Sequence, residues 1–190
     1  MFDVETFVAD CRKALAEANA GGAVRELLEC ALSDPREVER VLGTPTGAGF
    51  TALHRSPDLT IINVIWAPGM EIYPHDHRMW AVIGLYGGRE DNTFYRRTPH
   101  GLEAAGGKTL SMRDATLLGE NVVHSVANPL REFTGAIHVY GGEFFTAARS
   151  EWSEGLQSER PYDVERTKKV FAEANARWRA SLAGETAVKR

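Results

Sequence analysis

The sequence has few of the features that mark secreted or membrane-spanning proteins. It contains two cysteines, Cys11 and Cys30, and nothing requires a disulfide between them. The first residues, MFDVETFVADCRK, are acidic and amphipathic, whereas a secretory signal begins basic and continues apolar. No apolar run approaches the roughly 20 residues that cross a bilayer. We therefore expect a reduced, cytoplasmic protein with no membrane partner.

Clustered positive charge is also missing. The 22 Lys and Arg residues are outnumbered by 26 Asp and Glu residues, which gives a net charge of -4. Nucleic acids and polybasic membrane-binding surfaces both require clustered Lys and Arg, so we expect no nucleic-acid partner. Small-molecule chemistry is the better expectation.

Internal repeats, linkers and low-complexity tracts are absent as well. The 190 residues suit one domain with a single core, which we expect to span residues 1–190. Both a monomer and a homodimer are compatible with this sequence.

Helical patterns stand at the two ends of the chain. In residues 1–45 apolar side chains recur every three to four positions, and Asp34-Pro35 is typical of a helix cap followed by proline. A second helical pattern covers residues 161–183, with Phe171 among the residues on its apolar face. We expect this C-terminal helix to pack against the outside of the domain.

Between these ends, over residues 50–146, the pattern changes to short strands. Runs such as LTIINVIW, MWAVIGLY and FTGAIHVY are rich in β-branched and aromatic residues, and Gly, Pro, Asn and Asp separate them at close spacing. Many short strands with turn signals between them predict an antiparallel sandwich or barrel. The fold class is therefore mostly β.

The chain has only six histidines, and two of them stand one residue apart in PHDHRMWAVIGLYGG. Residues two apart in a strand point to the same side, so His75 and His77 can bind one ion while Asp76 faces away. Imidazole is the commonest metal ligand in proteins. We expect a turn, and no further ligand, at Glu90, which follows Gly87-Gly88.

A third ligand must come from another strand, and His124 in NVVHSVAN is the candidate. The run AIHVY could face it and carries His138 and Tyr140 on one side. A barrel interior lined by these side chains is more polar than packing requires, and metal binding would explain it. The alternative is a set of core or surface histidines whose hydrogen bonds are satisfied by backbone carbonyls.

These residues carry a resemblance to the cupin superfamily. Gly69, His75-Asp76-His77 and Gly84 are similar to its first motif, and His124 with Asn128 is similar to its second. The resemblance implies a double-stranded β-helix, or jelly-roll barrel, with N-terminal helices and a C-terminal helix. Most cupins have a glutamate shortly after the second histidine, where this chain reads MWAV. Cupins with three histidines only include the thiol dioxygenases.

Residues 53–145 also resemble the cysteine dioxygenase and 3-mercaptopropionate dioxygenase family. Trp66 and Trp80 match tryptophans of that family, and Ala136-x-His138-x-Tyr140 resembles its Ser-x-His-x-Tyr motif without the serine. The resemblance implies that His75, His77 and His124 bind the metal. It also implies that Tyr140 and His138 are catalytic, with the phenol beside the metal and His138 orienting it.

Members of this family bind the carboxylate of their substrate with an arginine upstream of the histidines. The nearest basic residues here are His54 and Arg55, in a segment that aligns only with a gap. The simpler interpretation of Arg55 is an exposed loop arginine, which leaves the carboxylate-binding residue unassigned.

The function implied by the resemblance is oxidation of a small thiol to a sulfinate by an Fe(II) dioxygenase that uses O2. Three neutral imidazoles leave a divalent ion its full charge, which favours anionic ligands such as a thiolate. Zn, Ni or Mn are alternatives to iron. Two other functions stay open: a Zn or Mn isomerase or hydrolase, and a non-catalytic cupin that binds a small ligand through its metal.

Overall fold

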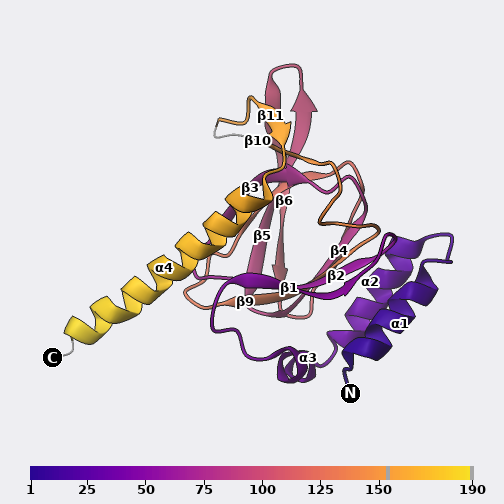
Figure 1. Ribbon diagram of the computed structural model, residues 1–190, viewed down its shortest axis with the longest axis horizontal. Helices are drawn as coiled ribbons and strands as arrows, with labels where there is room; N and C mark the ends of the chain where they lie inside the picture. The colour runs from indigo at the N-terminus through magenta and orange to yellow at the C-terminus, as the bar shows by residue number, and fades with distance from the viewer. Residues whose placement is uncertain (153–154, 189–190) are drawn as a thin grey trace.

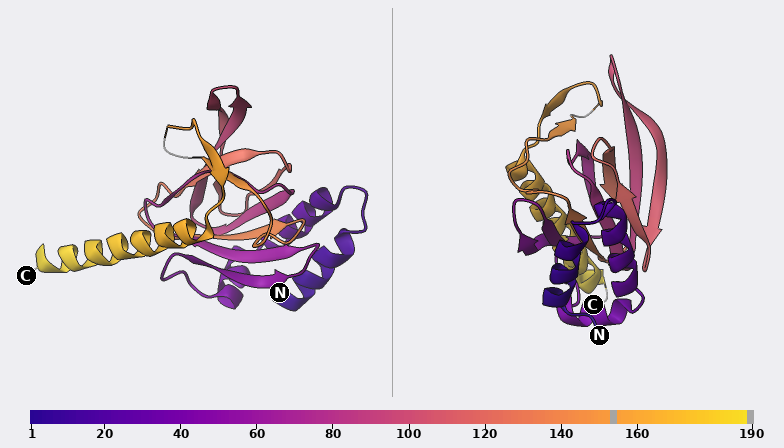
Figure 2. Two further views of the ribbon diagram at one scale, coloured as in Figure 1. Left: turned by 45° about the horizontal axis from the view of Figure 1, so that its top comes forward. Right: turned by 90° about the vertical axis from the view of Figure 1, so that its right-hand side faces the viewer.

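The computed structural model describes the backbone of residues 1–152 and 155–188, and the side chains of these residues up to 183. Two antiparallel sheets face each other and enclose the core (Figure 1). Three short helices cover one sheet, and a long C-terminal helix leaves on the opposite side (Figures 1 and 2). None of the helices in the described part of the chain is long and apolar enough to cross a membrane.

The predicted N-terminal helical segment forms α1 (Val4–Ala14), α2 (Ala20–Ala31) and α3 (Pro35–Leu42). Each helix begins after an Asp or Asn whose side chain accepts a hydrogen bond from a backbone N–H of the first turn. Their apolar faces pack on the outer face of one sheet. Gly84 lets α2 approach that sheet, because a Cβ there would lie 2.6 Å from side-chain atoms of Leu28 and Leu32.

The strands form a five-stranded and a six-stranded sheet. In spatial order the first contains β1 (Gly49–Arg55), β2 (Thr60–Trp66), β9 (Thr134–Tyr140), β4 (Ala81–Gly87) and β7 (Ala115–Leu118). The second contains β11 (Glu159–Pro161), β10 (Ser150–Trp152), β3 (Glu71–Asp76), β8 (Val123–Ala127), β5 (Arg89–Thr98) and β6 (Gly101–Ser111).

The strand order is that of a jelly roll. The pairing of strands β2 to β9 is nested and antiparallel: the first pairs with the last, the second with the next to last, and so on. The pairs are β2 with β9, β3 with β8, β4 with β7, and β5 with β6. The further pairs β4–β9 and β5–β8 join these strand pairs into the two sheets. The predicted double-stranded β-helix, mostly β with N-terminal helices and a C-terminal helix, is therefore confirmed.

The region after the predicted barrel adds an element that the sequence analysis missed. Strands β10 and β11 form a small hairpin that extends the six-stranded sheet, with Glu151 opposite His75. Glu151 is fully buried and binds the guanidinium groups of Arg160 and Arg166. Strands of three residues are too short to show an alternating pattern, which is why the sequence did not reveal them.

The C-terminal helix α4 (Val164–Val188) corresponds to the helix predicted over 161–183, but its place differs from the expectation. Its first turns close one side of the barrel interior instead of covering the outside: Phe171 stacks on Trp66, with ring centroids 5.5 Å apart, and meets Phe50 edge-on at 5.6 Å. The second half extends beyond the barrel (Figure 1). The helix therefore helps to shape the interior cavity.

Candidate metal centre and its cavity

Three histidines from two neighbouring strands meet in the barrel interior. His75 lies near the end of β3, His77 directly follows that strand, and His124 lies on β8 opposite His75. The Nε2 atom of His77 lies 3.3 Å from Nε2 of His75 and 3.3 Å from Nε2 of His124. All three side chains are buried. The strand spacing thus brings together the three residues that the sequence analysis selected.

Hydrogen bonds to the Nδ1 atoms of His75 and His124 show why the three histidines suit a cation. Nδ1 of His75 lies 2.9 Å from the carbonyl oxygen of Tyr73, and Nδ1 of His124 lies 2.7 Å from the amide oxygen of Asn92. These acceptors place the single proton of each neutral ring on Nδ1 and leave Nε2 as a lone pair. Nε2 of His77 can donate to only one of its two neighbours. At least one 3.3 Å contact therefore sets two lone pairs against each other, and a metal ion between them would remove the repulsion.

The three ligand candidates are also uncharged near neutral pH. Burial lowers the pKa of His75 to about 3, and burial together with the neighbouring histidines holds the pKa values of His77 and His124 well below their usual range. Neutral imidazole is the form that binds metals. The group could hold a metal ion, and the donor set alone does not select which one.

Asp76 points away from the imidazoles, as strand alternation predicts. Its buried carboxylate binds Arg97 and Arg78 and accepts a 2.7 Å hydrogen bond from the backbone N–H of Ser150. Ser150 is the first residue of β10. Asp76 therefore fixes the β10 hairpin beside the histidines.

Behind the histidines lies a buried carboxylate. The expectation of a turn at Glu90 was wrong, because the chain turns at Gly88 (φ +75°) and β5 begins at Arg89. The Glu90 side chain accepts hydrogen bonds from Nε1 of Trp66 (2.8 Å) and Nδ2 of Asn92 (2.9 Å). Burial alone would raise the pKa of Glu90, but the adjacent His138 and Asn92 outweigh it and lower that pKa. Glu90 is therefore an ionised group inside the barrel wall.

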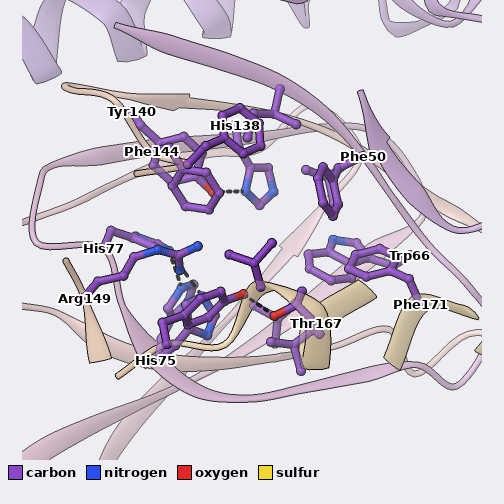
Figure 3. Close-up of a pocket in the computed structure, with 18 residues that line it drawn as sticks. Phe50, Trp66, His75, His77, His138, Tyr140, Phe144, Arg149, Thr167 and Phe171 are labelled. Atoms are coloured by element: carbon purple, nitrogen blue, oxygen red, sulfur yellow. Dashed lines mark hydrogen bonds between the residues drawn. The ribbon is translucent and has the colours of Figure 1, made fainter. Parts of the chain in front are cut away.

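Tyr140 and His138 lie on the opposite wall, on β9. The Tyr140 hydroxyl is 3.0 Å from Nδ1 of His138, and the phenol ring meets the His77 ring edge-on with centroids 5.1 Å apart (Figure 3). Burial raises the pKa of Tyr140, so the phenol keeps its proton. The structure thus brings the second predicted pair to the same cavity as the three histidines.

Arg149 is a residue of the site that the sequence analysis missed. It is 7% exposed, and its guanidinium carbon lies 3.4 Å from the centre of the Tyr162 ring and 4.1 Å from that of Phe144. Its Nη1 atom is buried and has no hydrogen-bond partner among the described residues. A buried cation with an unpaired donor is costly, and a bound anion would satisfy it. No periodic or motif signal surrounds this arginine, since it lies in the loop before the short strand β10.

Arg55, the basic candidate from the sequence, lies elsewhere. It ends strand β1 rather than standing in a loop, it is half exposed, and it forms an ion pair with Glu143 at 2.6 Å. It does not line the cavity that contains the histidines. The expectation of an exposed arginine is correct, and its placement in a loop is wrong.

The cavity is small and has two unlike ends. Arg149 lies beside His75 and His77 at one end, whereas Trp66 and Phe171 lie at the other (Figure 3). Its volume is about 60 Å³. An apolar cavity of ~150 Å³ is enough for benzene, so this space suits a ligand of only a few heavy atoms.

Comparison with known proteins adds a set of remote structural similarities. No protein-family model matches the sequence. A cupin superfamily protein from Desulfitobacterium hafniense is 14% identical and covers 53% of this chain and 84% of its own, with a TM-score of 0.44. A double-stranded β-helix protein from Klebsiella pneumoniae is 16% identical over 59% of this chain and 86% of its own, with a TM-score of 0.46.

An oxalate oxidase in complex with the substrate analogue glycolate is 15% identical, with a TM-score of 0.42. The match covers 53% of this chain and 54% of the oxalate oxidase, so it spans little more than half of that enzyme. The jelly-roll assignment rests on the strand pairing of this chain and does not depend on these similarities.

Proposed function

We propose that the protein is an iron(II)-dependent dioxygenase that oxidises a small thiol with an anionic group to a sulfinate. One observation carries this proposal: three neutral imidazole nitrogens, a guanidinium with one buried N–H group that is unpaired among the described residues, and a protonated phenol line one cavity of about 60 Å³. The resemblance of the histidine segments to the thiol dioxygenases supports the same chemistry.

His75, His77 and His124 would hold the iron, each through Nε2, and they add no negative charge to it. When bound, iron(II) would supply the redox chemistry that O2 activation requires. A neutral donor set leaves the ion its full charge, so a thiolate is a favoured ligand of the remaining positions. The role of the protein here is to keep the three nitrogens aligned through the hydrogen bonds to Tyr73 and Asn92.

Arg149 would bind the other end of the substrate. Its planar guanidinium suits a carboxylate, which it can hold by two parallel hydrogen bonds. The rings of Tyr162 and Phe144 fix the guanidinium in place through contacts on its faces. A small thiol that also carries a carboxylate would suit a cavity lined by both Arg149 and the three histidines.

Tyr140 would hold a proton near the reacting atoms. Its hydroxyl stays protonated, and the side chain lies next to His77. The phenol has one proton, which it can donate to Nδ1 of His138 or, once a substrate is bound, to an anionic atom of the substrate or of oxygen. The apolar residues at the far end exclude water, which protects a reactive sulfur species from side reactions.

The overall reaction balances without a further reductant: R–SH and O2 give R–SO2H, and both oxygen atoms are transferred to sulfur. Four electrons leave the sulfur and reduce O2.

The test is anaerobic loading of the protein with Fe(II), followed by measurement of O2 uptake with cysteine, 3-mercaptopropionate, mercaptosuccinate and cysteamine. We expect thiol-dependent uptake with one sulfinate formed per O2, and faster turnover of carboxylate-bearing thiols than of cysteamine. No thiol-dependent uptake by the fully loaded protein would refute the proposal.

A further inference from the structure

We propose that Glu90 is a positioning residue that sets the proton positions on two histidines, His124 of the metal centre and His138 beside Tyr140. This inference rests on the metal centre of the proposed function, but not on thiol oxidation. It is based on the position of one buried carboxylate. Glu90 is hydrogen-bonded to Asn92, which contacts His124, and it lies next to His138 and accepts a hydrogen bond from Trp66.

The link to the metal centre runs through Asn92. Oε1 of Glu90 accepts a 2.9 Å hydrogen bond from Nδ2 of Asn92, which turns the amide oxygen of Asn92 toward Nδ1 of His124 at 2.7 Å. An amide oxygen can only accept, so Nδ1 of His124 must carry the ring proton. Nε2 of His124 is then free to bind a metal. All three side chains are buried, so water does not compete for these bonds.

The orientation of the Glu90 carboxylate is fixed by Trp66. The indole Nε1–H donates to Oε2 at 2.8 Å, and an indole nitrogen has no accepting form. Only an acceptor can therefore occupy the Oε2 position. The Trp66 ring is itself held by stacking against Phe171.

The second link is to His138. Its Nε2 is buried without a hydrogen-bond partner among the described residues and lies 3.7 Å from Oε2 of Glu90. A carboxylate at this place favours the ring proton on Nε2, which leaves Nδ1 to accept from the Tyr140 hydroxyl at 3.0 Å. Among the described residues, Glu90 is the carboxylate that lies next to Nε2 of His138, while Tyr140 lies at its Nδ1.

The substitution Glu90→Gln tests this arrangement with almost no change of shape. The amide oxygen of Gln must face Trp66, so its NH2 group faces the NH2 group of Asn92. Asn92 relieves this contact by reversing its amide, which presents a donor to Nδ1 of His124 and moves the ring proton to Nε2. We expect the affinity for Fe(II), or for Co(II) as a spectroscopic probe, to fall between about 10- and 100-fold.

A second substitution should rescue the first. In the double variant Glu90→Gln/Asn92→Asp, the Gln NH2 group donates to the Asp carboxylate, which again accepts from Nδ1 of His124. The single variant Asn92→Asp instead sets two carboxylates against each other. We expect the double variant to bind metal more tightly than Glu90→Gln, because the Asp carboxylate, unlike a reversed Asn92 amide, can only accept from Nδ1 of His124 and so returns the proton to that nitrogen.

The experiment measures metal affinity by competition with a chelator for the parent and the three variants, after circular dichroism has shown which of them fold. Imidazole ¹⁵N chemical shifts of the metal-free proteins report the protonated nitrogen of His124. Weakened binding by Glu90→Gln, a shifted proton and rescue in the double variant would support the inference.

Unchanged affinity in Glu90→Gln, or a double variant no better than Glu90→Gln, would overturn the role of Glu90. A parent protein that binds neither metal would instead refute the proposed function. In that case the ¹⁵N shifts of metal-free parent and variant still decide whether Glu90 controls the proton on His124.

Discussion

The buried guanidinium of Arg149 gives the sharpest test of which substrates the protein accepts. In Arg149→Met an unbranched apolar side chain remains between Tyr162 and Phe144, while the charge is lost. Removing one partner of a buried charge pair costs about 2–5 kcal/mol, and about 1.4 kcal/mol corresponds to a tenfold change. We therefore expect the KM for 3-mercaptopropionate to rise at least about 30-fold.

The assay is O2 uptake by the Fe(II)-loaded protein over a range of thiol concentrations. Cysteamine, which has no carboxylate, should show nearly the same KM with the parent and with Arg149→Met. Arg55→Met is the matched control, because Arg55 lies outside the cavity in an ion pair with Glu143, and its KM should equal that of the parent. A parental KM for 3-mercaptopropionate in Arg149→Met, or an equal rise for both thiols, would show that Arg149 does not bind the anionic group.

Three further predictions concern the histidines and Tyr140. His77→Ala should lose both metal and activity, because His77 is the central member of the trio, and metal analysis after gel filtration would detect any retained ion. Tyr140→Phe should keep its metal and turn over at least about tenfold more slowly, since the hydroxyl of this ring, which lies edge-on to His77, contributes a proton donor; a parental kcat would contradict that role. The metal-free protein should lose stability as pH falls below about 6.5, because His75, His77 and His124 have lowered pKa values when folded and gain protons first in the unfolded chain. Between pH 7 and 5.5 we expect a loss of roughly 1 kcal/mol for each histidine by urea unfolding; a flat profile would indicate that these rings are not buried and neutral.

The two walls of the cavity differ in what they can do. The polar end combines three neutral histidines, which could hold a metal ion, with the guanidinium of Arg149, and under the proposed function it would favour an anionic ligand. The buried carboxylate nearby, Glu90, lies behind His124 and reaches it only through hydrogen bonds with Asn92.

The fold class and the three histidines that meet in the barrel could both be predicted from the sequence. Alternating short strands between turn residues predict a β-barrel because strand periodicity is a local property, and the spacing of His75 and His77 places both rings on one side of a strand. His124, His138 and Tyr140 were found the same way, since each shares a strand face with other inward residues.

The contributions of Arg149 and Glu90 became visible in the three-dimensional structure alone. Arg149 and Glu90 carry no local signal: one lies in a loop before a three-residue strand, and the other follows two glycines that suggest a turn. The role of each depends on contacts with residues distant in sequence, such as Trp66 for Glu90 and Tyr162 for Arg149. The burial of Arg149 and of Glu90 depends on which segments surround each side chain, and no pattern along the chain records that.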